Sequence, residues 1–252
     1  MTIAARGLTD VGQRRDHNED SFLVDERLGL FVVADGMGGH AGGGTASRLA
    51  VETIRDRVQR AREVDPGTFS SRTRLDEHPA RNVLREAVET ACSTIFHTAQ
   101  REPALAGMGT TVTAVLVVEG VGAFVAHVGD SRCYLVRGGR IYQVSEDHSL
   151  VNEQLKSGAI TLEEARTSRF RNIITRSVGF EEAVLVDLMG LVLQPGDRLL
   201  VCSDGLTNMV DDAQLLEVSS TSPVEQIPQR LVDRANAAGG EDNVTVVVLR
   251  VD

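Results

Sequence analysis

Short apolar runs rich in β-branched residues recur along the chain, and most are bounded by glycine, proline or charged residues. Runs of this length and composition are typical of strands buried in a sheet. They predict strands at residues 3–9, 21–24, 30–34, 110–119, 123–128, 132–137, 140–144, 184–189, 198–203 and 244–251. The four strands between residues 110 and 144 have short connections, so they predict an antiparallel meander.

Apolar residues at helical spacing predict amphipathic helices at residues 45–61 and from Pro79 onward. Two more helices are expected after residue 205, and the sequence Ser222-Pro223-Val224-Glu225 marks the start of the later one. Gly239 and Gly240 mark its end. Strands grouped in runs and helices grouped in pairs, without strict alternation, indicate the α+β class with antiparallel sheets.

Two segments have a different character from the predicted strands and helices. Residues 63–78 show no period and predict a long, mobile loop. Residues 145–179 are polar and helix-prone, with the spacing of a capping box between Thr161 and Glu164. The second segment predicts a surface flap, and the alternative is a pair of solvated helices.

Composition and charge narrow the class of protein. The chain has 252 residues, 42% of them hydrophobic and 25% charged, as expected for a globular protein. This length predicts one large domain, and the alternative is two small ones. Its formal net charge of −10 argues against nucleic acid or a membrane as the main partner. No apolar run approaches the roughly 20 residues that span a bilayer, and the N-terminus lacks the apolar core of a signal peptide. Three distant cysteines without metal-ligand spacing indicate core thiols, so we expect a cytoplasmic protein.

The stretch Leu30–Gly44 holds the first candidate for a functional site. Its apolar run stops at Asp35, and Gly36 opens a Gly-rich segment. Glycine at this density suggests that some other group must approach the main chain closely. In an antiparallel hairpin, Asp20 at the start of one strand lies beside Asp35 at the end of the next. The alternative for Asp35 and Gly36 is a simple tight turn.

Five aspartates, at positions 20, 35, 130, 204 and 242, sit at the boundaries of apolar strands. If they converge, cations must offset their repulsion. Ligation by oxygen alone selects hard ions such as Mg²⁺ and Mn²⁺. Two such ions joined by a carboxylate can activate water to attack phosphorus in line. Arg15 would then hold the phosphate with its planar fork of donors, unless it is a plain surface residue.

Six short motifs, in order, resemble those of the metal-dependent protein Ser/Thr phosphatases of type 2C in their bacterial form. They are Gly12-x-x-Arg15-x-x-Asn18-Glu19-Asp20, Asp35-Gly36-Met37-Gly38-Gly39-His40, Gly107-Met108-Gly109-Thr110-Thr111, Val128-Gly129-Asp130-Ser131-Arg132, Ser203-Asp204-Gly205-Leu206 and Asp242-Asn243-Val244-Thr245. The resemblance extends over residues 7–249. Each motif alone is weak, but six in the right order are specific.

The resemblance implies a four-layer α/β/β/α sandwich of two antiparallel sheets flanked by helices. It implies one catalytic domain over residues 1–252, with a flap subdomain at about residues 145–179. The implied cofactors are two Mn²⁺ or Mg²⁺ ions, with a possible third. Among the implied metal ligands, Asp35 bridges two ions and the Gly36 carbonyl binds one of them. Asp204 and Asp242 bind the first ion, and Glu19 and Asp20 support the second largely through water. Asp130 marks the third ion.

Two residues match the catalytic positions of the family. Arg15 matches its phosphate-binding arginine. His40 matches the histidine of the bacterial Gly-Gly-His motif and is the candidate general acid. The eukaryotic general acid directly follows Asp-Gly, where this chain has Met37. The alternative for His40 is a loop histidine bonded to the backbone.

The resemblance therefore implies a phosphoserine/phosphothreonine protein phosphatase. Its implied partners are phosphorylated proteins, and a Ser/Thr kinase or that kinase's substrates. Hydrolysis of small phosphoesters is a second possibility for the same site. A third is a catalytically inactive module of the same fold that binds phosphoproteins, and a fourth is a protein that binds divalent ions only for stability. The complete set of carboxylates argues against the inactive module.

Overall fold

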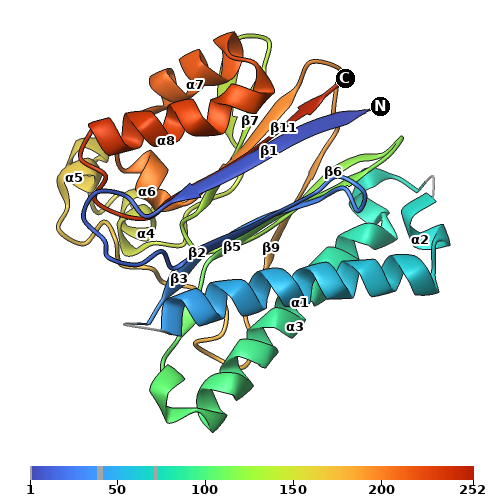
Figure 1. The fold of residues 1–252 in the computed structure, drawn as a ribbon, viewed down its shortest axis with the longest axis horizontal. Helices are drawn as coiled ribbons and strands as arrows, with labels where there is room; N and C mark the ends of the chain where they lie inside the picture. The colour runs from blue at the N-terminus through green and yellow to red at the C-terminus, as the bar shows by residue number, and fades with distance from the viewer. Residues whose placement is uncertain (1, 39–41, 71–72) are drawn as a thin grey trace.

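The computed structural model describes residues 2–38, 42–70 and 73–252. Two antiparallel sheets lie face to face, and helices cover the outer face of each (Figure 1). This arrangement confirms the α+β class and the four-layer α/β/β/α sandwich. Both termini lie at one end of the sandwich, opposite the end where α4, α5 and α6 gather.

The first sheet has six strands in the order β2-β3-β5-β6-β9, with β4 paired to β3. Its strands are β2 Asp20–Asp25, β3 Leu30–Met37, β4 Gly109–Thr110, β5 Val112–Val118, β6 Gly122–Val128 and β9 Asp187–Leu191. Two long helices, α1 Gly42–Val64 and α3 Pro79–Arg101, cover its outer face. Their apolar faces and the sheet form one buried cluster, which explains the helical spacing in the sequence.

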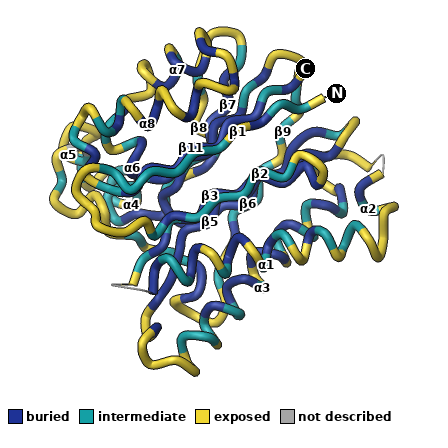
Figure 2. Tube along the Cα trace, in the orientation of Figure 1, coloured by how far each residue is buried: buried dark blue, intermediate teal, exposed yellow. Residues whose placement is uncertain are grey.

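The second sheet has five strands in the order β1-β11-β10-β7-β8. Its strands are β1 Ile3–Asp10, β7 Arg132–Arg137, β8 Arg140–Gln143, β10 Arg198–Cys202 and β11 Val244–Val251. The helices α7 Asp212–Thr221 and α8 Ile227–Ala237 cover it and enclose a second buried cluster. A third cluster fills the space between the two sheets. Figure 2 shows that the central strands are mostly buried and that the outward faces of the helices are exposed. The edge strands β1, β2, β8 and β9 are mostly intermediate or exposed.

The remaining elements are short. They are α2 Gly67–Ser70, α4 Leu150–Lys156, α5 Leu162–Thr167, α6 Asp204–Thr207 and the 3₁₀ turns η1 Leu75–Glu77, η2 Pro103–Leu105 and η3 Val224–Gln226. The capping box predicted for Thr161 and Glu164 is present at the start of α5. All three cysteines are buried and free, as expected of core thiols. No helix in the described part of the chain has the length and hydropathy needed to cross a membrane.

The predicted meander over residues 110–144 is wrong as a single sheet. β5 pairs with β6 in the first sheet, whereas β7 pairs with β8 in the second. The chain crosses between the sheets at residues 129–131, where Gly129 has a φ of +111°. A connection of hairpin length therefore joins two layers, and it carries Asp130 at the crossing.

Two other expectations need correction. Within residues 63–78, α1 extends to Val64 and is followed by α2 and η1, so the described part is not an irregular loop. The later C-terminal helix, α8, begins at Ile227, because Val224–Gln226 forms a 3₁₀ turn first.

Candidate active site

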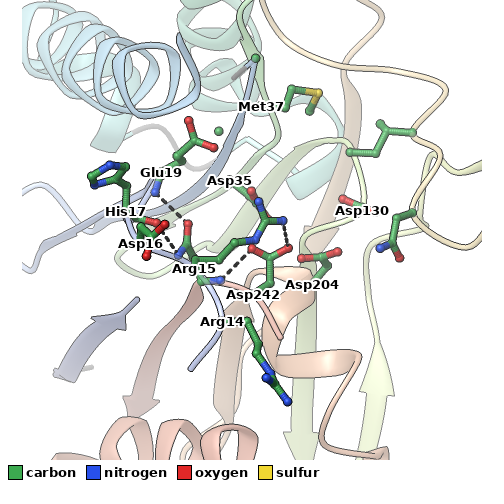
Figure 3. A pocket seen from close by; sticks show the side chains of 15 residues that line it. Arg14, Arg15, Asp16, His17, Glu19, Asp35, Met37, Asp130, Asp204 and Asp242 are labelled. Carbon is green, nitrogen blue, oxygen red and sulfur yellow. Dashed lines mark hydrogen bonds and ion pairs between the residues drawn. The ribbon is translucent and has the colours of Figure 1, made fainter. Parts of the chain in front are cut away.

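An open pocket of about 490 Å³ lies where the ends of both sheets meet (Figure 3). It contains most of the residues that the sequence predicts for the site. The lining residues are Arg14, Arg15, Asp16, His17, Glu19, Asp35, Gly36, Met37, Gly38, Asp130, Asn172, Ile174, Asp204, Asp242 and Asn243. His40 lies outside the described residues. Asp20 does not line the pocket.

Asp20 is buried next to Asp35, as the hairpin geometry predicts. The two residues are direct partners in the β2–β3 ladder. The Oδ2 atom of Asp20 accepts hydrogen bonds from Ser203 Oγ at 2.9 Å and Thr245 Oγ1 at 2.6 Å. Burial raises the pKa of Asp20 to about 7, against the opposing effect of those two bonds. A carboxyl from the first sheet is thus held by hydroxyls of the second.

Asp35 is held through its backbone by two threonines. Its N–H donates to Thr111 Oγ1 at 2.9 Å, and its carbonyl accepts from Thr110 Oγ1 and the Thr111 N–H at 2.8 Å each. β3 continues through Met37, three residues beyond the strand predicted at residues 30–34. Burial raises the pKa of the Asp35 carboxyl well above its usual value, and Asp20 is the charged neighbour with the largest effect.

Gly36 lies where two segments approach closely. A Cβ atom there would be 2.1 Å from the Gly43 carbonyl oxygen and 2.6 Å from that of Glu19. Real Cβ contacts are never this short, so this position has no room for a side chain. The dense glycines of this stretch let the start of α1 pack against β3.

Asp204 and Asp242 come from the second sheet. Asp204 is the first residue of α6 and is separated from β10 by Ser203 alone, and Asp242 precedes β11. Burial raises the pKa of Asp204, and the charge of Asp242 adds to this effect. Asp242 Oδ2 accepts a hydrogen bond from Arg15 Nη2 at 2.7 Å. The predicted phosphate-binding arginine therefore stands at the carboxylate cluster, as Figure 3 shows.

Asp130 lies at the crossing between the sheets and is almost completely buried. Burial raises the pKa of its carboxyl to about 8, and the largest charge effect comes from Asp204. Its Oδ1 atom has no hydrogen-bond partner among the described residues. The crossing thus brings the fourth of the predicted ligand aspartates to the pocket, beside Asp35, Asp204 and Asp242.

The donor set fits hard divalent cations. Three buried carboxylate oxygens have no hydrogen-bond partner in the described part of the chain: Glu19 Oε1, Asp20 Oδ1 and Asp130 Oδ1. Buried oxygens of this kind need a ligand, and a cation would also offset the crowding that raises the neighbouring pKa values. Within the described ranges, no three His, Cys, Asp or Glu side chains already stand in metal-binding geometry. The unpartnered carboxylate oxygens are therefore the feature of this site that suits a hard cation.

Several pocket residues had no assigned role in the sequence analysis. Asn243 Oδ1 accepts the Glu19 N–H at 2.8 Å, and its Nδ2 donates to the carbonyls of Val11 and His17 at 2.9 Å each. Its place directly after Asp242 in the last motif was the only signal in the sequence. Asn172 and Ile174 reach the pocket from the expected flap. Arg14, Asp16 and His17 border it from the polar loop before β2.

Comparisons with known proteins identify the family and the fold. The model of a family described as "Protein phosphatase 2C" matches residues 12–243. The chain is 38% identical over 250 residues to protein phosphatase PhpP of Streptococcus pneumoniae, covering 97% of this chain and 96% of that protein. The crystal structure of the Mycobacterium tuberculosis serine/threonine phosphatase PstP/Ppp is 35% identical, with a TM-score of 0.88 and complete coverage of both chains.

A second similar structure holds metal ions. It is the catalytic domain of the serine threonine protein phosphatase PstP, solved in complex with two manganese ions. It is 34% identical to this chain, with a TM-score of 0.83, and 99% of each chain is covered. Sequence, fold and pocket lead to one conclusion: this chain belongs to the protein phosphatase 2C family of metal-dependent phosphatases.

Proposed function

We propose that this chain hydrolyses phosphoserine and phosphothreonine in proteins at a centre of two Mn²⁺ or Mg²⁺ ions, with a third, weaker ion at Asp130. The observation that carries the proposal is the convergence, in one pocket, of carboxylates from both sheets beside Arg15. The related PstP domain with two manganese ions supports the binuclear centre. The related phosphatases also support phosphorylated proteins as partners, and we propose that these include a Ser/Thr kinase or that kinase's substrates.

We assign the ligands as follows. Asp35 would be the ligand shared by both ions, and the Gly36 carbonyl would bind one of them. Asp204 and Asp242 would hold the first ion, while Glu19 and Asp20 would support the second through water. When bound, the ions supply Lewis acidity that lowers the pKa of water and favours in-line attack on phosphorus. Ser203 and Thr245 keep Asp20 in place, and Thr110 and Thr111 keep Asp35 in place.

Arg15 is suited to bind the phosphate of the substrate. Its side chain is 51% exposed. Among the described residues its hydrogen bond to Asp242 uses Nη2 alone. The remaining N–H groups of the guanidinium can donate to phosphate oxygens. We propose His40 as the general acid for the leaving alkoxide, and residues 145–179 as a flap beside the site within one catalytic domain.

The proposal is tested by phosphate release from a phosphothreonine peptide at rising Mn²⁺ concentrations. Loss of Lewis acidity removes several kcal/mol of transition-state stabilisation, so Asp35→Asn should lower kcat at least about 100-fold. Asp204→Asn and Asp242→Asn should have nearly the same effect, and chelation should stop the wild type reversibly. Asp16→Asn, an exposed pocket residue outside the ligand set, is the matched control. Full turnover in excess chelator would contradict the metal mechanism.

The alternative of an inactive phosphoprotein-binding module gives a different result. Such a module would bind the phosphopeptide and release no phosphate at any Mn²⁺ concentration. A binding measurement beside the activity assay therefore separates the two functions.

A further inference from the structure

The segment Asp147-His148-Ser149 connects β8 to α4 and contacts the turn that carries Asp130. His148 binds both polar backbone groups of Gly129. The His148 N–H donates to the Gly129 carbonyl at 2.7 Å, and the His148 Nδ1 atom accepts the Gly129 N–H at 3.0 Å. His148 therefore provides a hydrogen-bond partner for both the N–H and the carbonyl of Gly129, the residue before Asp130.

Gly129 needs such an anchor because its conformation is unusual. Its φ is +111°, and a Cβ atom there would lie 2.6 Å from Thr111 Cγ2. Only glycine fits, and glycine restrains the backbone least. The neighbouring Asp130 Oδ1 has no hydrogen-bond partner among the described residues. The direction of the Asp130 carboxylate therefore depends on the backbone of this turn.

The far side of the His148 ring is also fixed. Because Nδ1 accepts a hydrogen bond, the neutral ring carries its proton on Nε2, and this proton points to Asp187 Oδ2 at 3.1 Å. Asp187 Oδ1 in turn accepts a hydrogen bond from Arg176 Nη1 at 2.7 Å. The Arg176 Nη1 atom also lies 3.0 Å from Nε2, but a protonated Nε2 cannot accept from it. Asp187 thus sets both the tautomer and the ring orientation.

His148 also touches the base of the expected flap. Its carbonyl accepts the Thr175 N–H at 2.9 Å, and Ser149 forms an isolated bridge with Ile174. Ile174 lines the pocket. His148 is therefore bonded both to the Asp130 turn and to the strand-like pair from which the flap extends.

We propose that His148 is a positioning residue for Asp130. Its Nδ1 atom fixes the backbone of the Gly129–Asp130 turn. Its backbone carbonyl, bonded to the Thr175 N–H, fixes the position of that turn relative to the base of the flap. The consequence for metal binding rests on the proposed function, because it assumes that Asp130 binds a cation. The consequence for the backbone of Gly129 does not. Residues that orient metal ligands without touching the metal typically change affinity about 10- to 100-fold.

Two substitutions separate this role from simple packing. The amide of His148→Asn places an acceptor near the position of Nδ1, whereas that of His148→Gln places its polar atoms near Nε2. Amide hydrogen exchange of metal-free protein gives the first readout. We expect Gly129 to stay protected in the wild type and in His148→Asn, and to exchange at least about 10-fold faster in His148→Gln. Equal protection of Gly129 in both variants would overturn the proposal.

Mn²⁺ titration by calorimetry gives the second readout. We expect His148→Gln to weaken the weakest class of sites about 10-fold or more and to leave the tighter sites unchanged. In an Asp130→Asn background the same substitution should cause no further change, because its effect acts through Asp130. Additive effects would overturn the proposal. If His148→Gln does not fold, Asp187→Ala, which frees the ring but keeps Nδ1, replaces it. Absence of Mn²⁺ binding in the wild type would instead contradict the proposed function, while the exchange result would still stand.

Discussion

Asp20 and Asp35 face each other as direct partners across the β2–β3 ladder, so folding brings together two carboxyl groups, of which Asp35 lines the pocket and Asp20 is buried beside it. Directly opposed residues place their side chains on the same face of a sheet. The charge of Asp20 is the largest charge effect on Asp35, after burial itself. The local hairpin therefore creates a repulsion that bound cations would relieve.

The stability of the metal-free protein should fall as pH rises. Burial raises the folded-state pKa of Asp20 to about 7 and that of Asp130 to about 8, while unfolded aspartate titrates near pH ~3.9. Between these limits the folded state binds more protons than the unfolded state, so each carboxyl favours folding less as pH increases. We expect the melting temperature without metal to fall by at least about 5 °C between pH 5 and pH 8.

Two comparisons test the cause of this pH dependence. Asp130→Asn removes one of the titrating groups, so its metal-free melting temperature should depend less on pH than that of the wild type. Saturating Mn²⁺ should flatten the profile of the wild type, because the ion favours the ionised carboxylates. A metal-free melting temperature that rises from pH 5 to pH 8 would contradict the crowding of these carboxyls.

Arg15→Ala should mainly weaken substrate binding. A phosphate clamp acts on the ground state and the transition state alike, so we expect KM to rise about 10-fold or more with a smaller fall in kcat. Arg15→Lys should recover little, because lysine keeps the charge but loses the planar fork. Arg14→Ala is the matched control: Arg14 is exposed in the same pocket and forms no ion pair with the described residues. Equal kinetics for Arg15→Ala and wild type would make Arg15 a surface residue.

A methyl group at Gly36 should disrupt the site. Its Cβ would lie 2.1 Å from the Gly43 carbonyl oxygen, so β3 or the start of α1 must move. We expect Gly36→Ala to lower the free energy of unfolding by at least about 2 kcal/mol. In Gly44→Ala the nearest atoms to the new Cβ are 3.7 Å away, so this helical substitution should be neutral or stabilise by up to about 1 kcal/mol. Urea denaturation of both variants measures the difference.

His40 should matter most for substrates with poor leaving groups. If it is the general acid, His40→Ala should slow phosphothreonine-peptide hydrolysis about 10²- to 10⁴-fold. Hydrolysis of p-nitrophenyl phosphate should slow much less, because its phenolate leaves without protonation. An equal loss on both substrates would indicate damage to metal binding, which Mn²⁺ titration of the variant would reveal. No loss on either would leave His40 a loop residue.

Local sequence patterns were sufficient to predict that Asp20 and Asp35 lie together. The pairing of Asp20 with Asp35 follows from two adjacent strands and one short turn, so hydrophobic periodicity was sufficient to place it. Asp204 and Asp242 are different, because their strands lie in the other sheet. The hydrophobic periodicity of a sequence does not indicate which sheets pack against each other. Only the ordered motifs of the family indicated that these residues converge.

The errors have physical causes that sequence patterns do not contain. The connection between β6 and β7 has the length of a hairpin loop, yet the positive φ of Gly129 turns the chain into the second sheet. Asn243 holds the backbone of Glu19, which lies far away in sequence. A side chain that serves a distant loop leaves no local signal. The same is true of His148 and the turn before Asp130.

The crossing between the sheets at residues 129–131 has a consequence for the order of folding. Asp35 belongs to one sheet, Asp204 and Asp242 flank strands of the other, and Asp130 lies between the two. The full ligand set therefore does not exist until the sheets have docked, which is a late, long-range event in folding. Ions that bind only then would hardly speed folding but would slow unfolding. The metal centre would thus lower the rate at which the two sheets separate during unfolding.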